Sequence, residues 1–337
     1  MAVVPARNEA ETVARCVESL VAQDYDGEFR IVVVDDHSED ETAALARTTA
    51  QAAGKAERVE VLQAAELHPG WTGKLWALQQ GIGAAGPSKP DYYWFTDADI
   101  VHNPDTLRRL AIRAQSQQLD LASWMVLLQA KTIPEKLLIP AFLYFFLMLY
   151  PPKWIADRKS SIAGAAGGCI LLRREALEQI GGVVAIRAEV IDDCALARAV
   201  KRSGGTIWMG LTRKSVSLRS YATFGEIRDL IARTAFTQLK YSVMVLLGTI
   251  LGMLVVYVTP VVLAFHTQPV IWRISLAAWA LMTVTYLPTV RFYGLSPLWA
   301  PLLPSAAVFY LYATVLSSVR YWMGKGGQWK GRAQAGS

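Results

Sequence analysis

Two acidic residues, Asp97 and Asp99, follow an aromatic stretch and are separated by a single residue. At the end of a strand, such a pair can turn both carboxylates toward one cation. Carboxylate oxygens are the ligands that Mg²⁺ and Mn²⁺ prefer, and a cation held there would bridge to a diphosphate. The spacing therefore predicts a divalent metal site at Asp97 and Asp99, with a solvated turn as the alternative.

A second acidic pair, Asp192 and Asp193, opens a predicted helix that closes at Gly204 and Gly205. One carboxylate can cap the helix, and the other can act as a general base that takes a proton from an attacking hydroxyl group. The alternative is that both acids serve only to cap the helix.

Two more polar clusters follow predicted strands, at residues 5–9 (PARNE) and 35–42 (DDHSEDET). A carboxylate in such a place can accept hydrogen bonds from a nucleobase N–H or from ribose hydroxyls. For Ser38 and Glu41 we favour a simpler interpretation, a capping box that opens a helix. Lys74 lies among glycines and is a candidate phosphate ligand, although the GxxxxGK[ST] spacing of a P-loop is absent.

The histidines and cysteines do not form a predicted site. His102 could line the metal site, but a surface position is the simpler expectation for it. The cysteines lack CxxC spacing, which favours buried apolar positions in a reducing compartment. The residues are His37, His68, His102, His266, Cys16, Cys169 and Cys194.

A sheet is needed to bring these clusters together. Short apolar runs alternate with helical patterns up to about residue 220, which predicts a mostly parallel α/β sheet. Open sheets of this kind bind ligands at the carboxyl ends of their strands. The predicted strands are Ala2–Pro5, Arg30–Asp35, Val59–Gln63, Tyr92–Thr96, Leu121–Val126, Gly168–Leu172 and Thr206–Met209.

The rest of the chain has a different character. Three apolar segments, at about 243–265, 270–290 and 297–319, are each long enough for a membrane helix of ~20 residues. Residues 137–150 are apolar but short, which favours an interfacial or re-entrant segment, with a buried core helix as the alternative. The composition excludes a soluble single domain, a disordered chain and a basic nucleic-acid binder.

The charges add information about topology. The net charge of +6 arises entirely after residue 242, since residues 1–242 are neutral and the last acidic residue is Asp229. Basic residues flank both ends of the apolar region, so the positive-inside rule places both flanks in the cytoplasm. Three full crossings would separate them, so one segment is re-entrant, another pair of crossings exists, or the rule fails. Pro301 and Pro304 make the third segment the best candidate for a broken helix.

In this order, the clusters resemble the family 2 glycosyltransferases of the GT-A fold. The resemblance runs over about residues 2–242, through PARNEAETV, VVVDDHSEDET, GWTGKLWALQQGI, FTDADI, GAAGGCILLRREALEQIGG and VIDDCALARAVKRSGG. With the apolar segments and the terminal WKGR, the chain looks most like the hopanoid-biosynthesis-associated subgroup, with ceramide glucosyltransferases as more distant relatives.

The resemblance implies a role for each matching residue. Pro5, Arg7, Glu9, Lys74 and Asp97 would lie along the nucleotide, and Asp36 would contact the uracil of a UDP-sugar. Asp97 and Asp99 would hold the metal, Mg²⁺ or Mn²⁺, at the diphosphate. Asp193 would be the catalytic base of an inverting displacement. Gly167, Gly168 and Asp192 would shape the pocket for the donor sugar and the acceptor.

The sequence also departs from the family pattern. Processive members carry a QxxRW motif, whereas Lys240 and Tyr241 stand here in place of Arg-Trp, which argues for a single transfer. The usual Glu-Asp pair is Asp192-Asp193. The N-terminal membrane helix of the family is absent and the chain starts almost inside a strand, so we expect that an N-terminal piece is missing.

The expectation is an inverting, metal-dependent glycosyltransferase at the bacterial inner membrane, with its catalytic domain on the cytoplasmic face. It would move one sugar from a UDP-sugar to a lipid acceptor, in hopanoid or other glycolipid biosynthesis, and would not bind nucleic acid. The expected domains are a GT-A domain at 1–242 with an interfacial segment at 137–152, a transmembrane region at 243–320 and a basic tail at 321–337. The alternatives are a membrane-bound nucleotidyltransferase and a non-catalytic membrane scaffold.

Overall fold

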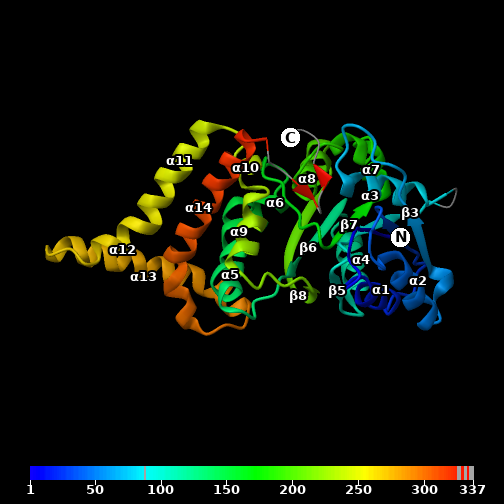
Figure 1. Cartoon of the computed structure of the whole chain (residues 1–337), viewed down its shortest axis with the longest axis horizontal. Coiled ribbons are helices and arrows are strands. Elements are labelled where there is room, and N and C mark those ends of the chain that lie inside the picture. Colours follow the sequence, from blue (N-terminus) through cyan, green and yellow to red (C-terminus); the bar gives the residue numbers. More distant parts are fainter. Residues whose placement is uncertain (87–88, 325–327, 330–331, 334–337) are drawn as a thin grey trace. The chain divides into compact units, whose positions relative to one another are not determined.

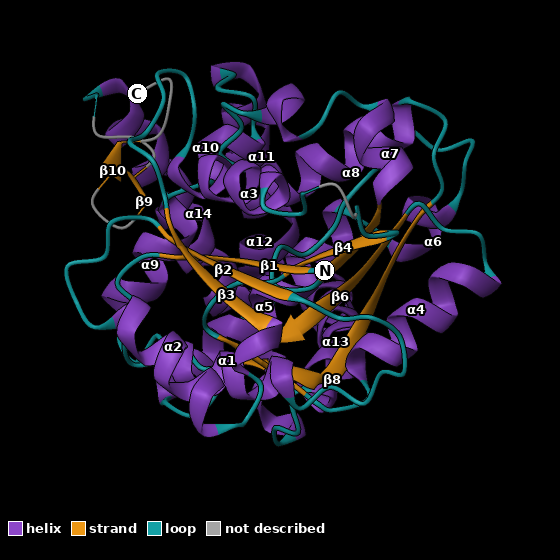
Figure 2. Ribbon diagram, turned by 90° about the vertical axis from the view of Figure 1, so that its right-hand side faces the viewer, coloured by secondary structure: helices purple, strands orange, loops and turns teal. Residues whose placement is uncertain are grey.

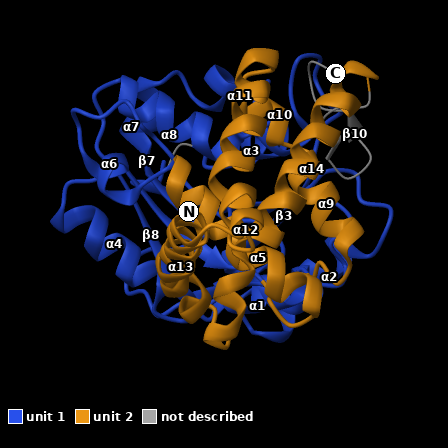
Figure 3. Ribbon diagram, turned by 90° about the vertical axis from the view of Figure 1, so that its left-hand side faces the viewer, with its two compact units in different colours: residues 1–128, 150–219, 329–336 blue, residues 129–149, 220–328, 337 orange. Residues whose placement is uncertain are grey.

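The structure is a computed structural model that describes residues 1–86, 89–324, 328–329 and 332–333 (Figure 1). The chain divides into two compact units (Figure 3). The first contains Met1–Leu128 and Tyr150–Arg219. The second contains Gln129–Leu149 and the chain from Ser220 through the last long helix. The expected domain boundary at residue 242 stays a prediction.

The first unit is built on a mixed sheet that has eight strands in the described part of the chain, in the order β3-β2-β1-β4-β7-β6-β8-β5. The strands β3, β2, β1 and β4 run parallel to one another, and β6 is parallel to β8. Strand β7 pairs antiparallel with β4 and β6, and β5 pairs antiparallel with β8. The mixed α/β sheet expected from the sequence is confirmed. The strands are β1 Ala2–Ala6, β2 Ile31–Asp35, β3 Val59–Gln63, β4 Tyr92–Phe95, β5 Ile100–His102, β6 Leu121–Leu127, β7 Ile170–Arg173 and β8 Ile207–Ser217.

Two strands differ from the expectation. The sequence did not predict β5, because its three residues are too few for a periodic pattern. The strand β8 continues eight residues past Met209, and its far end pairs with β5, from His102↔Ser215 to Ile100↔Ser217. Both differences lie beside Asp99, so they change the description of the site.

Helices cover both faces of this sheet, with α1, α2 and α4 on one face and α3 and α8 on the other (Figure 2). Alternate residues of a strand point to opposite faces, so Val4 of β1 joins the core with α1, whereas Val3 faces α3. The helical elements are α1 Val13–Val21, α2 Thr42–Ala52, η1 Ala56–Arg58, α3 Gly73–Gly83, α4 Thr106–Ser116, α6 Pro152–Ala156, α7 Arg174–Gln179, η2 Val183–Ile186 and α8 Asp192–Arg202.

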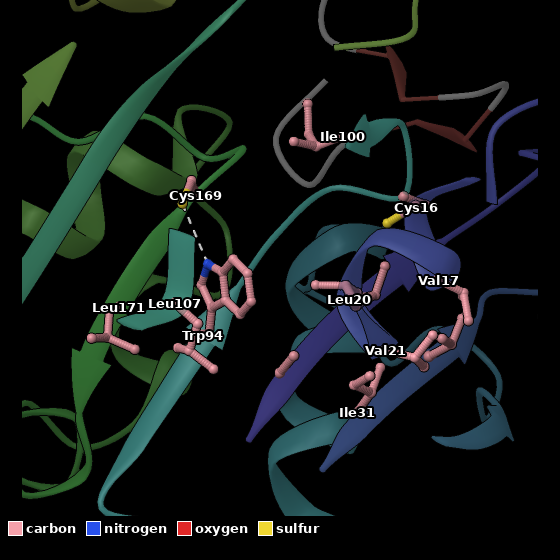
Figure 4. Packing of buried hydrophobic residues seen from close by; sticks show 14 of the residues in the cluster. Cys16, Val17, Leu20, Val21, Ile31, Trp94, Ile100, Leu107, Cys169 and Leu171 are labelled. Atoms are coloured by element: carbon pink, nitrogen blue, oxygen red, sulfur yellow. Dashed lines mark hydrogen bonds between the residues drawn. The ribbon is translucent and has the colours of Figure 1, made fainter. Parts of the chain in front are cut away.

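A core cluster of buried residues joins the sheet to α1, α2 and α4, and Figure 4 shows part of it. Helix α1 places Cys16, Val17 and Leu20 on one buried stripe, as an amphipathic helix requires. Trp94 of β4 is fully buried, and its indole N–H donates to the Sγ of Cys169 at 3.3 Å. The three cysteines are buried free thiols, in agreement with the apolar role predicted for them.

The capping box predicted at Ser38 and Glu41 is wrong. Helix α2 begins at Thr42 and has no side-chain cap at Glu41, its N-cap residue. The hydroxyl of Ser38 instead accepts a hydrogen bond from the backbone N–H of Asn8 at 3.0 Å. The Ser38 hydroxyl, which the sequence pattern assigned to the helix N-terminus, therefore bonds to the loop after β1 instead.

The second unit consists of helices. In the described chain, three stretches are long and apolar enough to cross a membrane: Val243–Leu263, Pro269–Phe292 and Pro297–Trp322. They correspond to the three predicted segments, and the short apolar run at 137–150 belongs mainly to α5. The elements are α5 Ile133–Leu149, α9 Phe224–Ala232, α10 Ala235–Gln238, α11 Val243–Met253, the π-helix η3 Leu254–Val258, α12 Thr259–Leu263, α13 Pro269–Phe292, η4 Pro297–Leu302 and α14 Leu303–Trp322.

Beyond α14, the described residues form two short strands, β9 Gln328–Trp329 and β10 Arg332–Ala333. Most of the predicted basic tail, including Lys325 and Lys330, lies outside the described residues.

Helix α3 packs on the sheet through a glycine. A Cβ atom on Gly81 would lie 2.3 Å from Cγ1 of Val3 and 3.0 Å from Cγ2 of Val34, whereas a Cβ on Gly83 meets nothing within 4 Å. We expect Gly81→Ala to lower the free energy of unfolding by about 1–3 kcal/mol, because the helix must move away from the strands. Gly83→Ala is the matched control and should be neutral or stabilising by up to about 1 kcal/mol.

Thermal unfolding of the purified protein in detergent measures both effects. Equal unfolding temperatures for the two variants would contradict this account of the packing.

Candidate active site

The carboxyl ends of three parallel strands, β1, β2 and β4, bring the polar clusters predicted from the sequence to one edge of the sheet. Strand β1 ends level with β2, at Ala6↔Asp35, and its Val3 pairs with Phe95, the last residue of β4. The loops that follow are joined by hydrogen bonds, since the backbone N–H of Glu9 donates to Oγ1 of Thr42 at 2.8 Å. The edge predicted to bind ligands is thus where the polar residues gather.

Lys74 lies at the centre of the acidic residues. Its Nζ is 2.9 Å from Oδ1 of Asp97 and 3.2 Å from Oδ2 of Asp192. Thr72 caps α3 by accepting a hydrogen bond from the N–H of Leu75, which puts Lys74 in the first turn. Burial works to lower the pKa of Lys74, but the nearby carboxylates of Asp192 and Asp97 outweigh it and raise the pKa. The side chain is therefore a fixed positive charge.

Asp193 is held by backbone donors at the start of α8. Its Oδ2 accepts a hydrogen bond from the N–H of Gly167 at 2.9 Å, and its Oδ1 accepts one from the N–H of Cys194 at 2.7 Å. Burial, with help from the charge of Asp192, raises the pKa of Asp193 to about 6, against the opposing effect of Lys74. An acid with this pKa changes protonation state near neutral pH, as a general base does.

The two glycines of the predicted pocket have different tasks. A Cβ on Gly167 would lie 3.1 Å from Nζ of Lys74 and 3.5 Å from Oδ2 of Asp193, so the backbone must come close to both groups. Gly168 packs against Val126, and its carbonyl accepts a hydrogen bond from Oγ1 of Thr96 at 3.0 Å. Gly167 belongs to the polar cluster, and Gly168 supports the sheet beneath it.

A pocket in the first unit collects six of the predicted site residues. Apolar side chains from α3, β4, η2 and α8 complete its wall. The predicted residues that line it are Pro5, Lys74, Asp97, Gly167, Asp192 and Asp193.

The remaining predicted residues lie in the loops around this pocket. Arg7 is almost fully buried and donates to the backbone carbonyls of Asp36 and His37, at 2.5 and 3.0 Å. Asp36 is also fully buried, at the start of the loop after β2.

Asp99 and Glu9 belong to a second ionic cluster, whose cation the sequence did not predict. Arg219 donates from Nε to Oδ2 of Asp99 at 3.2 Å and from Nη2 to Oε1 of Glu9 at 2.7 Å. Ser217 also donates to Oδ2 of Asp99, at 3.2 Å. Burial, then the charge of Asp97, raises the pKa of Asp99, and Arg219 opposes this. Arg219 could have been predicted as a partner of Asp99 only if the pairing of β8 with β5 were known, because this pairing brings the residues after β8 next to Asp99.

The surface position predicted for His102 is wrong, and the residue does not line the acidic site. Its exposed fraction is 2%. Its ring nitrogens are 2.8 Å from Oγ1 of Thr96 and 2.9 Å from Oγ of Ser215. Burial lowers the pKa of His102 to about 3, so the ring is neutral. It joins β5 to β4 and β8 beneath the site.

The residues fit a divalent cation in donor chemistry. Asp97 and Asp99 offer only carboxylate oxygens, and Asp97 faces the pocket with its side chain about one-third exposed. Among the described residues, no group of three or more His, Cys, Asp and Glu side chains is arranged to hold a metal. A cation at Asp97 would therefore need further ligands from a bound diphosphate or from water.

The Arg219 cluster generates a stability prediction. Arg219→Ala leaves two largely buried carboxylates without their shared partner, and we expect a loss of about 1–3 kcal/mol because the arginine itself is partly exposed. Lys214→Ala, on the strand β8 that leads to Arg219, is the control and should cost less than about 1 kcal/mol, because Lys214 is exposed and Asp105 keeps Arg109 as a second partner. Thermal unfolding measures both variants, and a larger loss in Lys214→Ala would be inconsistent with this assignment.

Comparison with known proteins identifies the fold and the family. The family model described as glycosyl transferase family 2 matches residues 1–181. The mannosyltransferase PcManGT from Pyrobaculum calidifontis, in complex with GDP-Man and Mn²⁺, is 17% identical over 96% of this chain and 87% of that chain, with a TM-score of 0.56. Glucosyl-3-phosphoglycerate synthase from Mycobacterium tuberculosis, with Mg²⁺ and UDP, is 18% identical over 70% of this chain and 77% of that chain, with a TM-score of 0.44.

A comparison with curated proteins finds no match. The expected fold is confirmed, a GT-A α/β unit accompanied by C-terminal helices of membrane-spanning length. Because the family model covers more than half of the chain, the protein belongs to glycosyl transferase family 2.

Proposed function

We propose that the protein is an inverting, metal-dependent glycosyltransferase that moves a single sugar from a UDP-sugar to a membrane lipid. The observation that carries the proposal is the shared pocket of Lys74 and Asp193. It sets a fixed positive charge, suited to a diphosphate, beside an acid whose pKa is raised to about 6, suited to activate a hydroxyl.

In the proposed reaction, Asp193 accepts the proton of the acceptor hydroxyl as its oxygen attacks the anomeric carbon from the face opposite the diphosphate. Backbone N–H groups of Gly167 and Cys194 hold the carboxylate in place. Lys74 contributes positive charge toward the leaving diphosphate. A Mg²⁺ or Mn²⁺ ion at Asp97, with Asp99 behind it, would supply further positive charge there when bound.

The roles along the nucleotide are also proposals. Pro5 lines the pocket, and the loops that hold Arg7, Glu9 and Asp36 meet at the same sheet edge. A base and ribose lying across this edge is the arrangement that doubly wound sheets favour. Support for a metal and a nucleotide sugar comes from the related fold of PcManGT, whose structure contains GDP-Man and Mn²⁺.

The lipid acceptor and the membrane location are supported by the apolar helices. Three stretches have the length and composition to cross a bilayer, and Arg233 and Lys240 precede them. By the positive-inside rule, we place the first unit on the cytoplasmic face of a bacterial inner membrane. Membership of the hopanoid-associated subgroup rests on the sequence motifs alone and belongs to the same proposal, as does the single, non-processive transfer.

The direct test is transfer from a panel of UDP- and GDP-sugars to total membrane lipid, with Mn²⁺ or with EDTA. We expect Mn²⁺-dependent transfer from at least one UDP-sugar, seen as a sugar-sized mass shift in a lipid. Transfer only from a GDP-sugar would overturn the choice of nucleotide. Release of pyrophosphate from a nucleoside triphosphate would indicate a nucleotidyltransferase, and lack of any metal-dependent nucleotide binding would indicate a scaffold.

Asp193→Asn should lower kcat by about 10²–10⁴-fold, because an amide cannot accept the proton. In the parent enzyme, kcat/KM should fall as the pH drops below about 6, since Asp193 is then protonated and cannot act as a base. The residual activity of Asp193→Asn should lack this step. Asp157→Asn, at an exposed acid in the same unit, is the control and should behave like the parent. An Asp193→Asn enzyme with parental kcat would refute the role of this residue.

A further inference from the structure

The two ends of the apolar region lie side by side in the second unit. Tyr241, two residues before α11, stacks on Tyr321 at the end of α14, with ring centroids 4.5 Å apart. Ser317 of α14 accepts a hydrogen bond from the N–H of Phe236 at 3.0 Å and donates to the carbonyl of Ala232 at 2.5 Å. The chain therefore starts its first apolar segment and finishes its third at the same place.

This adjacency restricts the number of crossings. A chain that crosses a bilayer three times ends on the side opposite its start, about 30 Å of hydrocarbon away. Residues in ring contact cannot be separated in this way. An even number of the three segments must therefore cross completely.

The third segment is the one whose surroundings are unsuited to hydrocarbon. Helix α14 runs along α9, with Phe309 near Phe224 and Arg320 bound to Asp229 at 2.7 Å. Helix α9 also carries Glu226 and Arg228. Charged side chains at the centre of a bilayer are costly, so α9 and the part of α14 beside it belong at the membrane surface.

The burial of the three segments supports this division. In an apolar stretch of 18 residues within Pro297–Trp322, 44% is buried inside the protein. The corresponding buried share is 17% for Pro269–Phe292 and 11% for Val243–Leu263. The first two segments leave large apolar side chains exposed, as expected of helices that lipid surrounds. Among these are Met244, Leu251, Val262, Val270, Ile274, Leu281 and Val284.

We infer that only the first two segments cross the bilayer, as a hairpin, and that α14 lies at the membrane surface with α9. The stretches Val243–Leu263 and Pro269–Phe292 have 21 and 24 residues, enough to span. Five residues join them, so they return antiparallel, as Figure 1 shows for α12 and α13. The inference rests on the membrane location in the proposed function and not on the transfer reaction.

Helix α5 belongs to the same surface layer. The chain leaves the first unit after Leu128 and returns to it at Tyr150, so a crossing by α5 would put parts of one compact unit on both sides. The hydroxyl of Tyr310 in α14 donates to the carbonyl of Leu138 in α5 at 3.0 Å. This agrees with the interfacial or re-entrant position predicted for 137–150.

The basic residues are distributed as this topology requires. Arg233 and Lys240 before the hairpin, Arg291 at its end and Arg320 in α14 fall on one side. Among the described basic residues from Arg233 to Arg320, only Arg273, near the start of α13, falls toward the other. The positive-inside rule then holds for both flanks at once, which three crossings did not allow.

Cysteine labelling tests the topology. Single variants Ala222→Cys, Thr267→Cys, Leu298→Cys and Met323→Cys are treated with a membrane-impermeant maleimide in intact and in permeabilised bacterial cells. The native cysteines are buried and serve as an unreactive background. Each variant must elute like the parent after purification, so that the labelling reports the native fold.

We expect Thr267→Cys to label in intact cells and the other three variants to label only after permeabilisation. Labelling of Leu298→Cys and Met323→Cys from opposite sides would mean that α14 crosses, and would overturn the inference. Labelling of Thr267→Cys and Ala222→Cys from the same side would overturn it as well, because the hairpin would not cross. These results do not depend on finding the sugar donor, so failure of the transfer assay leaves them interpretable.

Discussion

The buried ammonium group of Lys74 is the constraint on which the rest of the site depends. It contacts Asp97 after β4 and Asp192 at the start of α8, and its charge acts on Asp193. Removing charges from water is expensive, and such a cluster persists only when opposite charges and hydrogen bonds compensate one another. Lys74 therefore couples the strand end that carries the candidate metal ligand to the helix that carries the candidate base.

Two glycines allow the close backbone approaches that this cluster needs. Gly81 lets α3 approach β1 and β2, and Gly167 lets the backbone pass between Lys74 and Asp193. Arg219 performs a parallel task for Asp99 and Glu9, so neighbouring acidic residues are divided between two cations. Like-charged carboxylates at one sheet edge would otherwise repel each other, and one of them would become protonated.

Much of the sheet was predictable because several of its strands are continuous apolar runs bounded by turn residues. The alternating strand Val59–Gln63 also matches its prediction at both ends. The meeting of the polar clusters at one sheet edge followed from the strand ends, whereas the ion pairs of Lys74 with Asp97 and Asp192 were not predicted. Arg219, the strand at Ile100–His102 and the burial of His102 were missed, because each depends on pairing between segments more than 100 residues apart. Ser38 was misassigned since a hydroxyl near a helix start can serve a neighbouring loop equally well.

The central claim, that Lys74 and its carboxylates act as one unit, is tested most directly by a double-mutant cycle. Lys74→Met, Asp192→Asn and the double variant are compared with the parent by their free energies of unfolding. We predict a coupling energy of at least about 1 kcal/mol, because each single change leaves a buried charge uncompensated. The exposed pair Lys89–Glu178 is the matched control, with an expected coupling of about 0.5 kcal/mol or less. Additive effects at Lys74 and Asp192, within about 0.3–0.5 kcal/mol, would contradict the account.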